Sequence, residues 1–226
     1  MHIPDGALSL TTHGGALALS GPGIAVLSAG AAVAAAGTIV GLRRMDYERV
    51  PQVALLSAAF FVVSLVRVPL GPTSVHLVLN GLMGLILGWA AFPAILIALT
   101  LQAVLFGYGG LTTLGVNTVI MALPALVCHG LFYRAAHSKH DRAAVLGACA
   151  AGMVAYGLSA LLLGLALVAA GSEFTAPAQA LVLLHLPVAV VEGLVGAGAV
   201  AFLRKVRPEL LDAPLLEPIP REVPEP

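Results

Sequence analysis

The feature that most constrains this chain is the length of its uncharged apolar runs. Residues 74–106 contain no Asp, Glu, Lys or Arg. Only 10% of all residues are charged and 59% are hydrophobic, whereas a soluble globular domain carries about 25% charged residues. So few charges cannot cover a water-exposed surface of this size. The chain is therefore predicted to be an integral membrane protein.

The apolar runs predict an all-α fold, an integral membrane bundle of seven transmembrane helices. A helix that crosses a bilayer needs about 20 mostly apolar residues. The run of residues 74–106 is too long for one helix. We divide it at Trp89-Ala-Ala-Phe-Pro93, because aromatic residues favour a membrane interface and proline favours a helix start. The predicted helices span residues 23–42, 51–66, 75–89, 93–106, 117–133, 143–170 and 178–203.

The basic residues predict the orientation of these helices. Lys and Arg accumulate in the cytoplasmic loops of membrane proteins. With seven helices, Arg67 alone falls on one side. The other side holds Arg43, Arg44, Arg49, Arg134, Lys139, Arg142, Arg204, Lys205, Arg207 and Arg221. We therefore expect an outside N-terminus and a cytoplasmic C-terminus, with a transmembrane domain of residues 1–207 and a flexible Pro- and Glu-rich cytoplasmic tail of residues 208–226.

Several other classes of protein are excluded by composition. The formal net charge is zero, so the sequence gives no indication of nucleic acid as a partner. Cys128 and Cys149 lie in separate apolar runs without a CxxC pair and are interpreted as packing residues. No nucleotide-binding signature is present. Residues 1–21 lack the basic region and apolar core of a signal peptide, so we expect Met1 and His2 to remain in the mature chain.

The first two residues carry a metal-binding signal. The α-amine of Met1, the amide nitrogen of His2 and the Nδ1 atom of His2 can chelate one ion through a five-membered and a six-membered ring. These nitrogens lie nearly in a plane, and His76, predicted on the same outer face, could supply the fourth. Four nitrogens in a square plane favour Ni(II), Cu(II) or low-spin Co(II), whereas zinc prefers a tetrahedron. The alternatives are a solvated terminus for His2 and an interfacial position for His76.

Three motifs resemble those of a known family. They are Met-His-Ile-Pro-Asp-Gly at residues 1–6, Val-Pro-Leu-Gly-Pro-Thr-Ser-Val-His-Leu-Val-Leu-Asn-Gly at residues 68–81, and Gly-Tyr-Gly-Gly-Leu-Thr-Thr-Leu-Gly-Val-Asn-Thr at residues 107–118. Over residues 1–207 the chain resembles the cobalt and nickel substrate-capture subunits of energy-coupling-factor transporters, the CbiM and NikM proteins. It is closer to the cobalt branch. The resemblance implies a seven-helix bundle whose metal ligands are Met1, His2 and His76.

The resemblance also implies a function and partners. The chain would be the substrate-specific membrane subunit of an ATP-driven transporter in the cell membrane. It would capture Co(II) or Ni(II), its cargo rather than a cofactor, for cobalamin synthesis. The implied partners are a transmembrane coupling subunit and ATP-binding subunits, with a small accessory membrane subunit as a further candidate. Ala54 and Ala58 form a small-xxx-small pattern that could contact the coupling subunit or pack within the chain. Four nitrogens suit cobalt and nickel alike, so the metal stays open.

Polar residues inside the apolar runs are candidates for supporting roles. Asn80 follows His76 by four residues, so one helix face would hold both, and Asn80 either orients His76 or bonds a neighbouring helix. Asn117 is predicted to hold the N-terminal segment. His185 and Glu192 are predicted to form a buried pair that ties helices together. An intramembrane metalloenzyme using this pair is the alternative function, but four nitrogen ligands leave no open in-plane position for a reaction.

Overall fold

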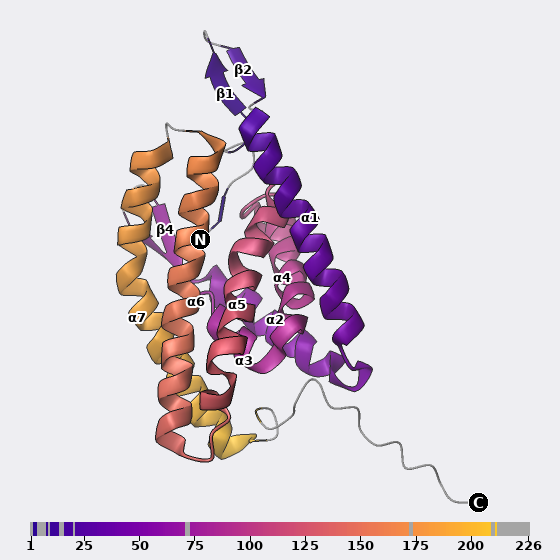
Figure 1. The fold of residues 1–226 in the computed structure, drawn as a ribbon, viewed down its shortest axis with the longest axis vertical. Coiled ribbons are helices and arrows are strands. Elements are labelled where there is room, and N and C mark those ends of the chain that lie inside the picture. Colours follow the sequence, from indigo (N-terminus) through magenta and orange to yellow (C-terminus); the bar gives the residue numbers. More distant parts are fainter. Residues whose placement is uncertain are drawn as a thin grey trace, which may run out of the picture.

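The computed structural model describes residues 2–3, 8, 10–13, 16–19, 21–70, 73–171, 174–208 and 211. These residues form a bundle of apolar helices (Figure 1), as predicted. The α-helices are α1 (Gly21–Arg44), α2 (Val50–Leu65), α3 (Asn80–Leu87), α4 (Ala91–Phe106), α5 (Leu114–Ala136), α6 (Asp141–Ala170) and α7 (Thr175–Val206). Two 3-10 helices, η1 (Tyr47–Arg49) and η2 (Gly88–Ala90), join α1 to α2 and α3 to α4.

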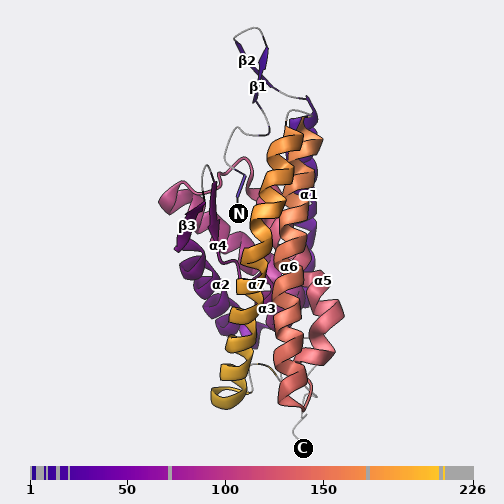
Figure 2. The same ribbon diagram turned by 90° about the vertical axis from the view of Figure 1, so that its left-hand side faces the viewer.

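Two short antiparallel hairpins interrupt the helical order. One pairs β1 (Leu10–His13) with β2 (Ala16–Leu19) and projects beyond the start of α1, as Figures 1 and 2 show. The other pairs β3 (Arg67–Leu70) with β4 (Thr73–His76), so that Arg67 lies opposite His76. The predicted helix start at residue 75 is therefore wrong. The Gly-Pro sequence disfavours helix, and Thr-Ser-Val after it favours an extended chain, so that helix begins only at Asn80.

Six segments of the described chain are long and apolar enough to span a membrane. One of them is the continuous segment Asn80–Phe106, which contains α3, η2 and α4. The predicted turn near Trp89 is present as η2. However, α3 has 8 residues, or about 12 Å of helix, and cannot cross a hydrocarbon core of about 30 Å. The predicted third helix is thus not a full transmembrane helix.

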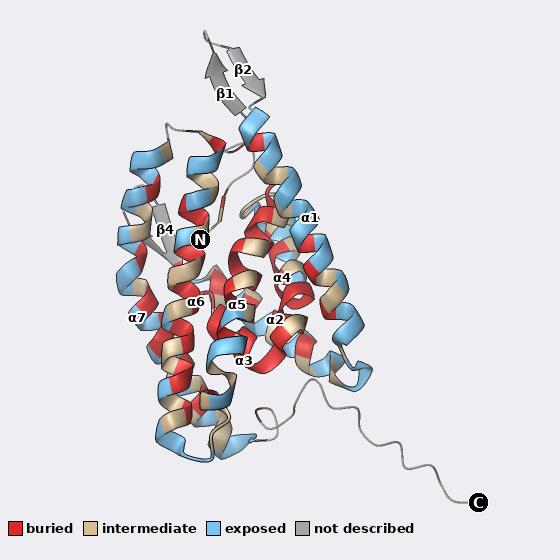
Figure 3. Ribbon diagram, in the orientation of Figure 1, coloured by how far each residue is buried: buried red, intermediate tan, exposed pale blue. Residues whose placement is uncertain are grey.

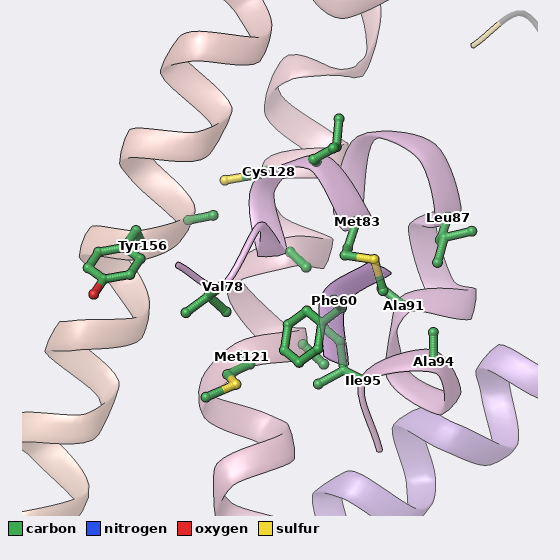
Figure 4. Close-up of a cluster of buried hydrophobic side chains, with 14 of the residues drawn as sticks. Phe60, Val78, Met83, Leu87, Ala91, Ala94, Ile95, Met121, Cys128 and Tyr156 are labelled. Atoms are coloured by element: carbon green, nitrogen blue, oxygen red, sulfur yellow. The ribbon is translucent and has the colours of Figure 1, made fainter. Parts of the chain in front are cut away.

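The core of the bundle lies around α3. All residues of α3 are buried, and buried residues also concentrate on the neighbouring parts of α4 and α5 (Figure 3). In Figure 4 the side chains of Phe60, Met83, Ile95 and Met121 meet in this core. Close helix contact depends on glycine, because a Cβ atom at Gly81 would lie 2.7 Å from the carbonyl oxygen of Ala151 in α6. The outer faces of α1 and α7 are exposed and apolar, as expected for contact with lipid.

Polar contacts join the helix ends at the opposite end of the bundle from the β1–β2 hairpin. Arg204 in the last turn of α7 forms a 2.9 Å ion pair with Asp141, the first residue of α6. Its guanidinium also donates to the carbonyl oxygens of Ser138 and Lys139 in the α5–α6 turn. We call this region, Ser138–Asp141 with Arg204, the basic end. The predicted tail of residues 208–226 lies outside the described residues except for Pro208 and the buried Leu211.

Candidate metal centre

The two histidines that the sequence analysis paired are in contact. Nδ1 of His2 lies 3.2 Å from Nε2 of His76, and the two rings stack with centroids 4.8 Å apart and an interplanar angle of 23°. His76 ends β4 and is buried, and His2 is half-buried. Met1 lies outside the described residues. Among the proposed ligands, the fold thus brings together two imidazoles that are 74 residues apart in sequence.

The orientation of the His76 ring follows from its neighbour in the chain. Nδ1 of His76 lies 3.0 Å from the carbonyl oxygen of Leu77. A carbonyl oxygen can only accept a hydrogen bond, so Nδ1 carries the proton and Nε2 presents its lone pair to Nδ1 of His2. A hydrogen bond between the two rings then requires a proton on Nδ1 of His2. A divalent metal ion bound by both rings would replace that proton.

The separation of the two nitrogens suits neighbouring positions around one metal ion. Metal–imidazole bonds are about 2.0–2.1 Å long, so nitrogens at right angles lie about 2.9 Å apart and opposite nitrogens about 4 Å apart. The observed 3.2 Å is close to the right-angled arrangement. In the chelate predicted for the first two residues, the amide nitrogen of His2 would lie between the amine and Nδ1. The open position is therefore beside Nδ1, where Nε2 of His76 lies.

Side chains of the α5 start hold the N-terminal segment by its backbone. The Ile3 amide donates to Oδ1 of Asn117 at 2.9 Å, and Nδ2 of Asn117 donates back to the Ile3 carbonyl at 3.1 Å. The Thr113 hydroxyl donates to the same carbonyl at 2.7 Å. Ile3 itself is buried. This contact, which we call the Asn117 clamp, fixes the residue that follows His2 and is consistent with the role expected for Asn117.

Gly109, in the loop between α4 and α5, lies against His2. Gly109 has φ +79°, a left-handed conformation that glycine adopts without strain. A Cβ atom at this position would lie 3.2 Å from Cδ2 of His2 and 3.2 Å from Nδ2 of Asn117. The absence of a side chain at Gly109 therefore leaves room for the imidazole and for the clamp.

The connector between β4 and α3, residues 77–79, is not helical, and Leu79 has φ 54°. Its amides are bound by the carboxylate of Glu192 in α7. Oε1 accepts from the Val78 amide, and Oε2 accepts from the Leu79 amide at 3.0 Å. A buried carboxylate at a helix N-terminus satisfies amides that have no partner within the helix.

The predicted pair of His185 and Glu192 does not form. Within the described part of the chain, no hydrogen bond or ion pair joins the two side chains. His185 places Nδ1 2.6 Å from the carbonyl oxygen of Leu181, one turn earlier in α7. Its ring stacks on Tyr156 of α6, with centroids 5.7 Å apart. Glu192 instead links α7 to the connector, because the non-helical backbone there has amides free to donate to it. No sequence pattern predicts the position of these amides.

Asn80 does not orient His76. Residues 76 and 80 lie on one face only if the chain between them is helical, and the connector is not. Nδ2 of Asn80 donates to the Ser159 hydroxyl at 2.7 Å and lies 3.3 Å from the carbonyl oxygen of Met121. Asn80 therefore links α3 to α5 and α6, which is the alternative role considered for it.

Two predicted residues and two that were missed remain to be placed. Ala54 and Ala58 are exposed on the outer face of α2. Thr113 and Tyr156 were not singled out by the sequence analysis. The Tyr156 hydroxyl donates to the carbonyl oxygen of His76 at 3.5 Å. A lone tyrosine within an apolar helix was the signal that could have found it, since buried tyrosines find a partner for the hydroxyl.

Comparison with known proteins finds metal transport proteins over most of the chain. A model of the family described as "Cobalt uptake substrate-specific transmembrane region" matches residues 2–210. A Haemophilus influenzae protein described as a metal transport protein is 41% identical over 78% of this chain and 87% of its own length. The fused nickel transport protein NikMN of Rhodobacter capsulatus is 34% identical over 93% of this chain and 64% of its own. The cobalt transport protein CbiM of Sorangium cellulosum is 36% identical over 72% and 76%.

Solved structures share the fold. The crystal structure of a truncated transition metal transporter superimposes with a TM-score of 0.72 at 26% identity, over 91% of this chain and 99% of that chain. A second transition metal transporter gives a TM-score of 0.69 at 25% identity, over 91% and 93%.

Proposed function

Because this chain belongs to the CbiM family of cobalt uptake substrate-specific transmembrane regions, we propose that it captures Co(II) or Ni(II) on four nitrogens for uptake. Family membership makes it a multi-pass plasma membrane protein and a membrane subunit for cobalt or nickel transport. The proposed ligands are the Met1 amine, the amide and Nδ1 of His2, and Nε2 of His76. Such a planar site suits both metals.

One observation carries the proposal: the 3.2 Å approach of Nδ1 of His2 to Nε2 of His76. The approach is supported from both sides, since the Asn117 clamp holds the chain after His2 and the Leu77 carbonyl orients the His76 ring. A site whose ligands are oriented before the metal arrives loses less entropy on binding.

We place this site on the outer face, with seven crossings of the membrane. The third crossing would be made by β4 and the non-helical connector, residues 73–79, followed by α3. Seven residues reach at most about 23 Å when fully extended, and eight helical residues reach about 12 Å. Together they are long enough for a hydrocarbon core of about 30 Å. An odd number of crossings puts the basic end in the cytoplasm, in keeping with the positive-inside rule.

Uptake by this chain requires partners, because its sequence contains no nucleotide-binding signature. We assign ATP hydrolysis to separate ATP-binding subunits, linked through a transmembrane coupling subunit as in energy-coupling-factor transporters. The exposed small residues Ala54 and Ala58 of α2 allow a partner helix to approach closely. A small accessory membrane subunit is the further candidate partner.

The decisive experiment changes where the chain begins. One extra residue before Met1 converts the proposed amine ligand into an amide and moves the new amine one residue away from His2. We expect this extension to abolish cobalt and nickel uptake in cells that contain the partner subunits, with unchanged expression and membrane insertion. A C-terminal tag is the control and should leave uptake intact. Normal uptake by the extended form would exclude the amine as a ligand.

A second variant tests the other half of the site. His76→Ala leaves three of the four nitrogens, with water in the fourth position. We expect Ni(II) and Co(II) affinity of the purified protein to fall by about 100-fold, comparable to the larger effects of changes around metal sites. The ligand-field absorption of bound Ni(II) should shift as one nitrogen is replaced by oxygen. Unchanged affinity and absorption in a folded variant would remove His76 from the site.

A further inference from the structure

The start of α3 poses a problem that the fold has to solve. The first amides of a helix have no partner within the helix, and at membrane depth water is not available to bind them. α3 begins inside the buried core, at Asn80, directly after the non-helical connector. Glu192 binds the amides that lead into α3, since its two oxygens accept from the amide of Leu79, the N-cap residue, and from the amide of Val78 before it.

The connector is also the segment that sets the His76 ring. The Leu77 carbonyl accepts from Nδ1 of His76 and thereby directs Nε2 toward His2. The carbonyl of Leu77 and the amide of Val78 belong to one planar peptide unit. Glu192 holds the amide side of this unit, and His76 donates to its carbonyl side. A rotation of that single peptide would release both contacts together.

We infer that Glu192 is a positioning residue of the metal centre, which holds the 77–78 peptide so that Nε2 of His76 is aimed at Nδ1 of His2. This inference rests on the proposed function of the two histidines. Glu192 acts through the connector rather than as a ligand. Both of its oxygens are engaged by backbone amides, and no three His, Cys, Asp or Glu side chains of the described residues gather into a metal cluster.

The surroundings of Glu192 make it a rigid support. Its side chain is buried, with 1% exposed, in the tightly packed contact of α6 with α7. A Cβ atom at Gly152 of α6 would lie 2.8 Å from the Glu192 carbonyl oxygen, so the two backbones touch at this level. On α6, Tyr156 donates to the carbonyl of His76. His76, which ends β4, is therefore held by α6, and the connector that follows it is held by α7.

The test compares three variants of the full-length protein, purified in detergent and titrated with Ni(II). Glu192→Ala removes both acceptors, and Glu192→Gln keeps the shape but replaces one acceptor by an NH₂ donor. Val191→Ala changes the adjacent, lipid-facing residue of α7 and is the matched control. Nickel affinity and the ligand-field absorption of bound Ni(II) are measured for each, alone and combined with His76→Ala.

We expect Glu192→Ala to weaken nickel binding by about 10- to 100-fold, as is typical for residues that orient metal ligands. Its nickel spectrum should approach that of His76→Ala. Glu192→Gln should fall between wild type and Glu192→Ala, and Val191→Ala should match wild type. In the His76→Ala background, Glu192→Gln should have no further effect, because its action passes through the imidazole that is already missing.

Three outcomes overturn the inference. The first is wild-type affinity and spectrum in both Glu192 variants. The second is an equal loss of affinity with and without His76, since Glu192 would then act elsewhere. The third is failure of both variants to fold, which would assign Glu192 to stability alone. If instead wild-type protein shows no His76-dependent nickel binding, the proposed function fails, and the two failures are distinguished by that measurement.

Discussion

The segment from β4 to α3 and the helix pair α6–α7 cross the same bundle by opposite means. α6 and α7 are uninterrupted helices of 30 and 32 residues, which satisfy their own backbone hydrogen bonds. Residues 73–87 change from strand to connector to a helix of 8 residues. Such irregular backbone is tolerated at membrane depth only where protein groups surround it and bind its amides and carbonyls. The difference indicates that the irregular segment carries the proposed chemistry and that α6 and α7 support it.

The distribution of buried polar side chains follows the same division. Around the irregular segment, polar groups bind backbone directly: Glu192 binds the connector, Tyr156 binds His76, and Asn117 binds Ile3. Each contact reaches a neighbour that is far away in sequence. At the basic end, by contrast, Arg204 and Asp141 meet at an exposed surface. Changes near the irregular segment should therefore affect metal capture, and changes at the basic end should not.

The largest effect in this series is expected from Asn117→Ala. The variant removes both hydrogen bonds between Asn117 and Ile3 and leaves the buried Ile3 amide without a side-chain acceptor. His2 then loses its fixed position, and we expect nickel affinity to fall by about 10- to 100-fold. An unsatisfied buried amide also costs about 1–3 kcal/mol of stability. Nickel titration and thermal unfolding of the purified protein measure the two effects.

Thr118→Ala is the matched control for this variant. Thr118 is buried beside Asn117, but its hydroxyl donates to the Leu114 carbonyl within α5 and not to the N-terminal segment. It should bind nickel as wild type does. If Asn117→Ala and Thr118→Ala bind nickel equally well, the clamp has no part in capture.

Gly109→Ala, which also changes the surroundings of His2, should reduce nickel affinity less than Asn117→Ala does. The alanine Cβ would press on His2 and Asn117 at 3.2 Å, and φ +79° is strained for any residue with a Cβ. We expect a several-fold loss of nickel affinity and a stability loss of about 1 kcal/mol, the typical cost of strained backbone. Gly107→Ala isolates the strain, because Gly107 has φ +66° with no atom within 4 Å of the added Cβ. Equal nickel affinities of the two variants would show that contact with His2 is unimportant.

The same division explains which parts of the structure could be predicted from sequence. Long apolar runs predicted α1, α2, α4, α5, α6 and α7 to within a few residues, because hydropathy and length determine a lipid-facing helix. The run at residues 75–89 is just as apolar but forms a strand, a connector and a short helix. Its conformation depends on contacts from Glu192 to Val78 and from Tyr156 to His76, whose partners are more than 75 residues apart in sequence.

The candidate site was predictable to a similar extent. His2 and His76 were paired from chelate chemistry and resemblance, and the fold brings them into contact. The expectation that Asn80 orients His76 was wrong because it assumed a helix through residue 76. The role of Glu192 was missed because it was paired with His185 on the same face of its own helix. Side-chain contacts to backbone amides leave no periodic pattern in the sequence. Such contacts can be identified only from the three-dimensional structure of the irregular segment.

The smallest effect is expected at the basic end, from Asp141→Asn. This variant removes the charge that pairs with Arg204 at 2.9 Å, but the Asp141 side chain is 86% exposed and water screens the pair. Exposed ion pairs contribute about 1 kcal/mol or less, and Arg204 keeps its bonds to the carbonyls of Ser138 and Lys139. Thermal unfolding should therefore shift by at most a few degrees, and less at high salt, where the wild-type pair is itself screened. Nickel affinity should be unchanged, because the pair touches neither the connector nor the Asn117 clamp. A measurable loss of nickel affinity in Asp141→Asn would show that the two ends of the bundle are coupled, and the separation between a supporting and a capturing region would have to be abandoned.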